Sequence, residues 1–426
     1  MNYLNTGIPI VRYQKTCTQI PYVDKSGMIE LLNQKIGIND CYVCVTRPRR
    51  FGKTVNANML GAYYTKGYDT AELFQNRQIA AAPSFADHLN RHNVIYIDFS
   101  RRPDLCEDYH TYISSIRECF IEDLTECYPF LKEKKYDSIS RMLWDTKESF
   151  IFIMDEWDSI FYEEYMSERD KNAYLGFLKN LLKDQPYVDL AYMTGVLPIA
   201  KYSSGSELNM FAEYNFINDN IFDRYFGFSE SEVKGLCRQF NTVSYEDIRR
   251  WYDGYFQSDG SSLFNPRSVS MALTRGVCLN YWTETGPMNE VAECVENNAA
   301  EVREDVVKMV SGIPVRVELT GYSALQPSMK TRDEILSAMV VYGFLSYHNG
   351  YLQIPNLELM EKFQQVLTRS SMGEIREIVE SSRNMLQATL SGDEGKFASF
   401  LEEVHDREIP FLEYNDKTHH CRIEKL

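Results

Sequence analysis

One eight-residue segment has the composition of a phosphate-binding loop. Residues 47–54 read RPRRFGKT and lie directly after an apolar run and directly before a helical pattern. Backbone N–H groups in such a loop, together with the N-terminus of the helix that follows, bind anions. In this arrangement Lys53 reaches the β- and γ-phosphates and the Thr54 hydroxyl ligates Mg²⁺. The segment therefore predicts a nucleotide phosphate site, against the alternative of an exposed helix start that carries a lone lysine.

The rest of the loop is assigned to the same site. We expect Arg49, Arg50, Phe51 and Gly52 to contact the nucleotide through backbone N–H groups or guanidinium groups. For the two arginines, solvated positions on the loop and contact with the γ-phosphate of a neighbour's nucleotide remain alternatives. Arg47 stands where the pattern G-x-x-x-x-G-K-[ST] has its first glycine, so this loop must turn without that glycine.

Two consecutive carboxylates follow another apolar run about 100 residues later. Asp155 and Glu156 come directly after residues 150–154, which read FIFIM. An Asp at the end of a buried strand is placed to hold Mg²⁺ through its water shell. The adjacent Glu156 can polarise an attacking water as a general base. Solubilising strand ends, or charges that interact with a helix dipole, are the alternatives. Together with the loop, the pair predicts nucleotide binding and hydrolysis.

A threonine ends another apolar run, further along the chain. Thr194 closes the run that begins at residue 190, and in sheets of this kind such a strand often carries a γ-phosphate sensor. A threonine that merely begins a turn is the alternative. The chain has no Asn/Thr-Lys-x-Asp sequence, the guanine-reading signature, after the acidic pair. This absence favours ATP over GTP.

The elements that must position these residues alternate between strand and helix. Strand-like runs cover residues 41–46, 94–100, 150–154 and 190–196, and helical patterns cover residues 56–64, 109–127 and 170–183. Short, nearly continuous apolar runs are typical of parallel strands that are buried on both faces. The order predicts an open α/β sheet with right-handed crossovers.

The pattern changes after residue 228. Ser229 and Glu232 predict a helix that starts with a capping box, in a mainly helical region, 229–330. Residues 331–370 combine a helix at 333–341 with a hairpin at His348-Asn349-Gly350, which predicts a winged-helix-like unit or a small α+β cap. The predicted domains are residues 1–228, 229–330, 331–370 and, as the start of a further domain, 371–426.

Composition excludes several classes of protein. The 426 residues include 45 Lys+Arg and 61 Asp+Glu, and the difference gives a formal net charge of −16. An acidic balance argues against a surface covered by nucleic acid but permits one local basic groove. No apolar run approaches the length of a membrane span, and no secretory signal precedes residue 14. Ten scattered cysteines are typical of a reduced protein, so we expect a cytoplasmic location.

The chain resembles the AAA-ATPase-like family of prokaryotic P-loop proteins. The matching segments include residues 22–29, 46–54, 153–158, 194–199, 226–230, 251–255, 264–268, 280–282 and 354–356. Arg47 in place of glycine is normal for that family. The resemblance implies an additional-strand ATPase with sheet order 5-1-4-3-2, and places Thr194 on the strand between the two nucleotide-binding strands.

Family members usually continue into a PD-(D/E)XK nuclease-superfamily domain. Such a site needs an Asp and then a strand that bears Glu/Asp-x-Lys. No such strand follows residue 371, and Glu424 and Lys425 lack the residue between them. We therefore expect a truncated C-terminal domain and no nuclease activity.

Four functions remain open on the sequence, and the last, a small-molecule kinase, has no recognisable acceptor site. The first is an ATP-binding, Mg²⁺-dependent and ATP-hydrolysing regulatory module that gates a C-terminal effector. The second is a scaffold that binds ATP without hydrolysing it. The third is a DNA-binding module in residues 331–354, where Lys330 and Arg332 are among few basic residues. A homo-oligomer and a protein partner for the C-terminal part are compatible with each, and no membrane partner is expected.

Overall fold

The computed structural model describes residues 1–19, 21–199, 207–217, 219–282, 300–317, 319, 331–369, 385, 388–389 and 391–399. The chain divides into two compact units, Met1–Met360 and Glu361–Leu426. The finer division into four domains stays a prediction. Lys330, Glu424, Lys425 and most of the predicted C-terminal domain lie outside the described residues.

A five-stranded parallel sheet forms the centre of the first part of the chain. Its strand order is β2-β3-β4-β1-β5. The strands are β1 (Tyr42–Thr46), β2 (Asn93–Asp98), β3 (Phe150–Asp155), β4 (Val188–Gly195) and β5 (Ala212–Tyr214). This is the predicted additional-strand order, with β4 between β1 and β3, and the predicted fold class is confirmed.

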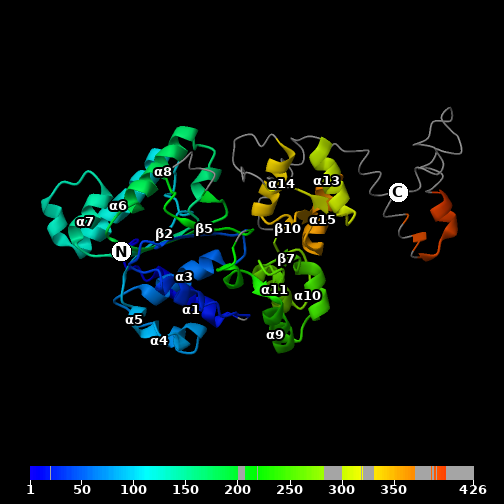
Figure 1. The fold of residues 1–426 in the computed structure, drawn as a ribbon, viewed down its shortest axis with the longest axis horizontal. Coiled ribbons are helices and arrows are strands. Elements are labelled where there is room, and N and C mark those ends of the chain that lie inside the picture. Colours follow the sequence, from blue (N-terminus) through cyan, green and yellow to red (C-terminus); the bar gives the residue numbers. More distant parts are fainter. Residues whose placement is uncertain are drawn as a thin grey trace. The chain divides into compact units, whose positions relative to one another are not determined.

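The strands are apolar because helices cover both faces of the sheet. Helices α1 and α3 lie on one face, and α6, α7 and α8 lie on the other (Figure 1). The helices of these layers and the short helices beside them are α1 (Ile8–Thr18), α2 (Met28–Asn33), α3 (Lys53–Tyr64), α4 (Ala71–Phe74), α5 (Phe85–His88), α6 (Tyr109–Cys127), α7 (Ile139–Thr146) and α8 (Glu168–Leu182). The predicted helix at residues 109–127 is confirmed to the residue. The first predicted helix starts earlier, at Lys53, so the loop lysine belongs to the first turn of α3.

The N-terminal residues pair with the outer edge of this sheet. The backbone N–H of Asn5 donates to the carbonyl oxygen of Val94 (2.7 Å), and that of Tyr96 donates to the carbonyl oxygen of Tyr3 (3.0 Å). The buried Asp123 of α6 accepts from the backbone N–H groups of residues 2–4. The edge strand β2 is thereby covered by the start of the chain.

Residues 228–282 form the predicted mainly helical region, to which three short strands are added. The helices are α9 (Glu230–Phe240), α10 (Tyr245–Tyr252) and α11 (Pro266–Arg275). The predicted capping box is confirmed, since Ser229 and Glu232 exchange side-chain and backbone hydrogen bonds at the start of α9. An antiparallel sheet, β6-β8-β7 (Phe228–Ser229, Ser262–Phe264 and Tyr255–Phe256), lies among these helices. Strands of two or three residues are too short to produce an alternating pattern, which is why the sequence predicts a mainly helical region here.

The following residues have the predicted winged-helix-like arrangement. Its elements are α13 (Ala300–Val310), β9 (Val315–Arg316), α14 (Arg332–Val341), β10 (Ser346–His348), β11 (Tyr351–Gln353) and α15 (Leu357–Arg369). The hairpin turn lies at Asn349 and Gly350, whose φ angles are 50° and 87°. Both angles are left-handed, as a two-residue type I′ turn requires, so the predicted hairpin is confirmed.

Two further features bear on the sequence-based expectations. Among the described residues, no helix has the length and apolar character needed to cross a bilayer. Cys41 and Cys44 are buried free thiols.

Candidate nucleotide-binding site

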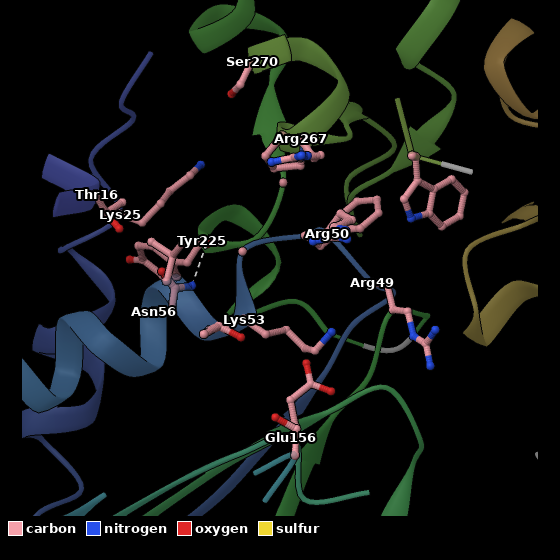
Figure 2. Close-up of a pocket in the computed structure, with 18 of the residues that line it drawn as sticks. Thr16, Lys25, Arg49, Arg50, Lys53, Asn56, Glu156, Tyr225, Arg267 and Ser270 are labelled. Atoms are coloured by element: carbon pink, nitrogen blue, oxygen red, sulfur yellow. Dashed lines mark hydrogen bonds between the residues drawn. The ribbon is translucent and has the colours of Figure 1, made fainter. Parts of the chain in front are cut away.

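A cavity of about 660 Å³ opens where β1 and β3 end and α3 begins. Its lining comes from the N-terminal segment, the loop before α3, the turn after β3 and helix α11. Figure 2 shows Lys53 and Glu156 extending toward one another from facing walls, with Arg267 and Ser270 on the wall formed by α11. A smaller cavity of about 450 Å³ is lined by Thr54, Asp155 and Glu156.

The phosphate loop closes around its own lysine. The Lys53 Nζ donates to the carbonyl oxygens of Arg47 and Pro48, at 3.1 Å each. Gly52 precedes the helix with φ +93°, and Arg50 has φ +71°. No atom lies within 4 Å of the position that a Cβ on Gly52 would occupy, so the backbone angle is what favours glycine there. The loop therefore has the sharp turn that directs backbone N–H groups toward a bound anion.

Arg47 explains how the loop turns without its first glycine. The side chain is 1% exposed and forms a buried ion pair with Asp219. Its Nη1 also donates to the carbonyl oxygens of Thr46 (2.8 Å) and Tyr214 (2.9 Å), and its guanidinium group lies 4.9 Å from the centroid of the Phe226 ring. The start of the loop is thus fixed to the chain that follows β5.

Phe51 lies in the loop but its ring points into an aromatic cluster. The ring packs edge-on against Phe216 (5.3 Å between centroids) and Tyr255 (5.1 Å). Its carbonyl oxygen accepts from the backbone N–H of Gly227 (3.2 Å). Because the side chain is buried, the part of Phe51 that is available to a nucleotide is its backbone.

The two consecutive acids have different surroundings. Asp155 is fully buried, and neither carboxylate oxygen has a hydrogen-bond partner among the described residues. Burial and the charge of Glu156 raise the pKa of Asp155 to about 7, against the opposing charge of Lys53. Glu156 lines both cavities and has φ +54°, an unusual angle for a residue with a side chain.

Thr194 is buried on β4 and lines neither of these two cavities. It pairs with Val45 of β1, and its carbonyl oxygen accepts from the backbone N–H of Trp157 (3.1 Å). No described residue provides a hydrogen-bond partner for its hydroxyl. The structure thus brings Arg49, Arg50, Phe51, Gly52, Lys53, Thr54 and Glu156 to the larger cavity, whereas Asp155 lines the smaller one and Thr194 lines neither.

Helix α11 contributes residues to the site that no sequence motif indicates. Arg267 and Ser270 line the large cavity, although Arg267 is about 210 residues from the phosphate loop. Asn265 caps this helix by accepting from the backbone N–H groups of Arg267 (3.0 Å) and Ser268 (3.2 Å). Asn-Pro before an apolar pattern signals a helix start, but nothing in the sequence places that start at the phosphate loop.

The cavity is strongly cationic. Burial lowers the pKa of Arg50, and the charges of Arg267 and Arg49 lower it further. Lys25 also contributes to the lining, with its Nζ 2.8 Å from Glu232. Repulsion among several cations in one cavity is relieved by a bound anion, which makes the site suitable for a polyphosphate.

Asp155 and Thr54 also fit the binding of a magnesium ion. Among the described residues, no group of three or more His, Cys, Asp or Glu side chains could hold a metal by itself. Mg²⁺ usually takes one or two protein oxygens and completes its shell with phosphate and water. The unpartnered oxygens of Asp155 lie beside Thr54 at one cavity, so these residues fit that mode of binding.

One family of known proteins matches the part of the chain that carries the site. Residues 8–204 match the AAA-ATPase-like family, described as "Predicted AAA-ATPase". No curated protein matches the chain. Among solved structures, the chain is similar to the ORC2 protein of Aeropyrum pernix in ADPNP–ADP complexes, at 12% identity and TM-score 0.38, over 83% of this chain and 98% of that one. It is also similar to the Walker-type ATPase PABY2304 of Pyrococcus abyssi, at 14% identity and TM-score 0.35, over 80% and 94%. The part that carries the phosphate loop, both acids and Thr194 is thus the part that matches the AAA-ATPase-like family.

Proposed function

We propose that this protein binds ATP with Mg²⁺ and hydrolyses it. The observation that carries the proposal is the meeting of Lys53, Asp155 and Glu156 at one edge of the parallel sheet, beside a cationic cavity. The match of residues 8–204 to a family described as a predicted ATPase supports it.

Each residue has a role in this proposal. The backbone N–H groups of residues 49–54 bind the phosphates, and Lys53 exchanges its two carbonyl partners for phosphate oxygens. Arg49, Arg50 and Arg267 neutralise phosphate charge as it develops during transfer. Thr54 and Asp155 would hold Mg²⁺, which supplies charge stabilisation at the phosphates.

Glu156 orients the attacking water and accepts its proton. Thr194, the proposed γ-phosphate sensor on β4, is buried outside both cavities, so in this proposal it acts only through the turn that its carbonyl oxygen shares with Trp157.

The larger role that we propose is regulatory. Arg267 and Ser270 belong to α11, outside the central sheet, so a bound nucleotide contacts both the sheet and the layer that follows it. A change of nucleotide state can therefore alter how α11 lies against the phosphate loop and gate an effector in the C-terminal part. A nucleotide-dependent scaffold is the alternative, and it differs in lacking turnover.

DNA binding by the winged-helix-like residues has less support. Arg332, one of the basic residues on which the idea depends, forms ion pairs with Asp305 (2.5 Å) and Asp333 (2.8 Å). An arginine that is engaged by two carboxylates contributes little to a phosphate-binding surface.

Two variants test the proposed hydrolysis. Lys53→Ala should abolish binding of a fluorescent ATP analogue, because it removes the ammonium group that faces the phosphates. Glu156→Gln should bind ATP with near-parental affinity but release phosphate at least ~100-fold more slowly, a loss within the range expected for a general base. Lys66→Ala and Glu148→Gln, which alter a partly exposed ion pair elsewhere, are matched controls and should behave as the parent does.

These measurements distinguish ATP hydrolysis from a scaffold that only binds ATP. Binding without phosphate release in the parent protein would favour the scaffold. Parental turnover in the Glu156→Gln variant would remove Glu156 from the chemistry.

A further inference from the structure

Asp158 is a buried carboxylate that the proposed hydrolysis does not use. It lies three residues after the end of β3 and is fully buried. Its Oδ2 accepts from the backbone N–H groups of Val196 (3.0 Å) and Leu197 (2.8 Å), which directly follow β4. Asp158 therefore joins the turn that contains Glu156 to the turn that follows Thr194.

Trp157 adds a second connection between the same two turns. Its backbone N–H donates to the carbonyl oxygen of Thr194 (3.1 Å), and its carbonyl oxygen accepts from the hydroxyl of Tyr174 on α8 (2.7 Å). Trp157 is fully buried. The two residues after Glu156 are thus fixed to β4, to the residues that follow it and to α8.

Gly195 shows how closely the two turns approach. A Cβ at this position would lie 2.4 Å from the Asp158 Oδ1 and 2.5 Å from Cδ1 of Trp157. Real Cβ atoms do not show contacts this short, so any side chain here would push the turns apart. The glycine lies directly after Thr194, on the opposite face of the strand.

Glu156 itself requires such support. Its φ of +54° is a conformation that costs about 1–3 kcal/mol for a residue with a side chain. A residue keeps such a strained φ angle when the residues on both sides of it are held firmly by the surrounding structure. Here the neighbours on the C-terminal side are fixed by Trp157 and Asp158, and the strand β3 fixes the N-terminal side.

We infer that Asp158 is a positioning residue that ties the turn of Glu156 to the residues after β4, so that the general base keeps its orientation toward the cavity. The inference rests on the proposed hydrolysis. Asp158 touches neither nucleotide nor water in this role and acts through the backbone of the two turns.

The role depends on an acceptor oxygen rather than on a charge. Oδ2 receives both backbone N–H groups, whereas Oδ1 faces Gly195 and has no hydrogen-bond partner in the described part of the chain. Asparagine has nearly the same shape and keeps one such oxygen. Asp158→Asn should therefore preserve the connection, and Asp158→Ala should remove it.

The test compares phosphate release, ATP affinity and amide exchange in three variants. Asp158→Ala should lower kcat by about 100-fold, the loss expected for a displacement of about 1 Å at a reacting group. Its Kd for ATP should stay within ~3-fold of the parental value, because the phosphate loop is unchanged. Asp158→Asn should recover kcat to within ~5-fold of the parent.

Gly195→Ala provides a second route to the same displacement and keeps the test decisive if Asp158→Ala does not fold. It should lower kcat and speed exchange at Val196 and Leu197, because its Cβ pushes on Asp158 and Trp157. Its Kd for ATP is not a readout here, because the Gly195 carbonyl oxygen accepts from the backbone N–H of Arg47 (3.0 Å) at the start of the phosphate loop. The matched control is Asp123→Ala, which removes another buried carboxylate that accepts backbone N–H groups, at the N-terminal edge of the sheet. It should lower stability but leave kcat unchanged.

Hydrogen–deuterium exchange at Val196 and Leu197 reports on the connection without ATP. Exchange should be faster in Asp158→Ala and near-parental in Asp158→Asn and Asp123→Ala. Slow exchange in the alanine variant, or fast exchange with parental kcat, would overturn the inference. Equal loss of kcat in the asparagine and alanine variants would also overturn it, because charge would then be the property that matters. A parent protein that releases no phosphate would instead refute the proposed hydrolysis, while the exchange pattern still decides whether Asp158 connects the turns.

Discussion

Individual residues at the end of β3 differ in ways that suit them for different roles. Asp155 is buried with its pKa raised to about 7, and a cation bound beside it would favour the ionised form. Glu156 faces the open cavity, where a water molecule can reach it. Asp158 is buried, and one of its carboxylate oxygens accepts hydrogen bonds from two backbone N–H groups. Three acids within four residues thus serve, in our proposal, a metal, a water molecule and the backbone.

Replacing Asp158 with Asn should change how the free energy of unfolding depends on pH. Burial and the charge of Glu156 raise the pKa of Asp158 from 3.8 to about 6. Because the folded state holds this proton more tightly, the stabilising contribution is complete below the unfolded pKa and is lost as the pH rises through about 6. At about 1.4 kcal/mol per pH unit, the parent should lose up to ~3 kcal/mol relative to the variant across this window.

Urea unfolding of both proteins at about pH 4, 5, 6, 7 and 8 measures this difference. The raised pKa of Asp155 contributes a slope of its own to both proteins, so the difference between them isolates Asp158. A difference that does not vary with pH would contradict the prediction.

At the scale of elements, the loop between β1 and α3 depends on its anchor at Arg47. Removing this side chain leaves Asp219 buried without its partner. Arg47→Ala should therefore lower the free energy of unfolding by about 3–5 kcal/mol. A double-mutant cycle with Asp219→Ala should give a clear coupling energy, because each single change leaves the other charge uncompensated.

Urea unfolding of the two single variants and the double variant measures that coupling. Arg12→Ala is the control, since its pair with Asp98 is longer (3.4 Å) and partly exposed, and the change should cost less than ~1 kcal/mol. Single losses that simply add in the double variant would show that Arg47 and Asp219 act independently.

The sequence predicts the elements that have strong local signals. The four long strands, the helix at residues 109–127, the capping box at Ser229 and the turn at Asn349 are each visible in periodicity or turn chemistry. Strands β5, β6, β7 and β8 are two or three residues long and leave no such pattern. Their pairing is decided by contacts that are distant in sequence.

The same limit applies to the site. The phosphate loop and the acidic pair are contiguous in sequence and are predictable, whereas Arg267 and Asp158 are not. Arg267 reaches the cavity because β6 and β8 bring α11 there, and Asp158 meets Val196 only once β3 and β4 are paired. The ion pair of Arg47 is likewise a product of tertiary structure.

At the scale of the whole first unit, Glu358 connects the winged-helix-like residues to α11. Its Oε1 accepts from the backbone N–H groups of Tyr281 (2.7 Å) and Trp282 (2.8 Å), and both carboxylate oxygens accept from the Ser268 hydroxyl (3.0 and 2.9 Å). Ser268 neighbours Arg267, and Trp282 lines the large cavity. A contact about 90 residues from α11 in sequence thus supports the wall of the nucleotide site.

Glu358→Ala should therefore affect both stability and ATP affinity. It leaves three buried donors without an acceptor, at about 1–3 kcal/mol each, so we expect a loss of at least about 3 kcal/mol. The Kd for ATP should rise several-fold, because α11 is less firmly held. Urea unfolding and ATP titration measure the two effects, with the largely exposed Glu304→Ala as control. A stability loss with unchanged ATP affinity would show that α11 does not depend on this contact.

The strand order has a consequence for how the protein is made. Strand β1 leaves the ribosome early, but its central neighbour β4 ends at Gly195, about 150 residues later. At the usual ~5–20 residues per second, β1 and the apolar face of α3 wait roughly 8–30 s for that partner. The first five residues likewise wait for β2. Before then the nascent chain exposes an apolar strand beside a cationic loop, which makes this interval the period in which a chaperone has most to protect.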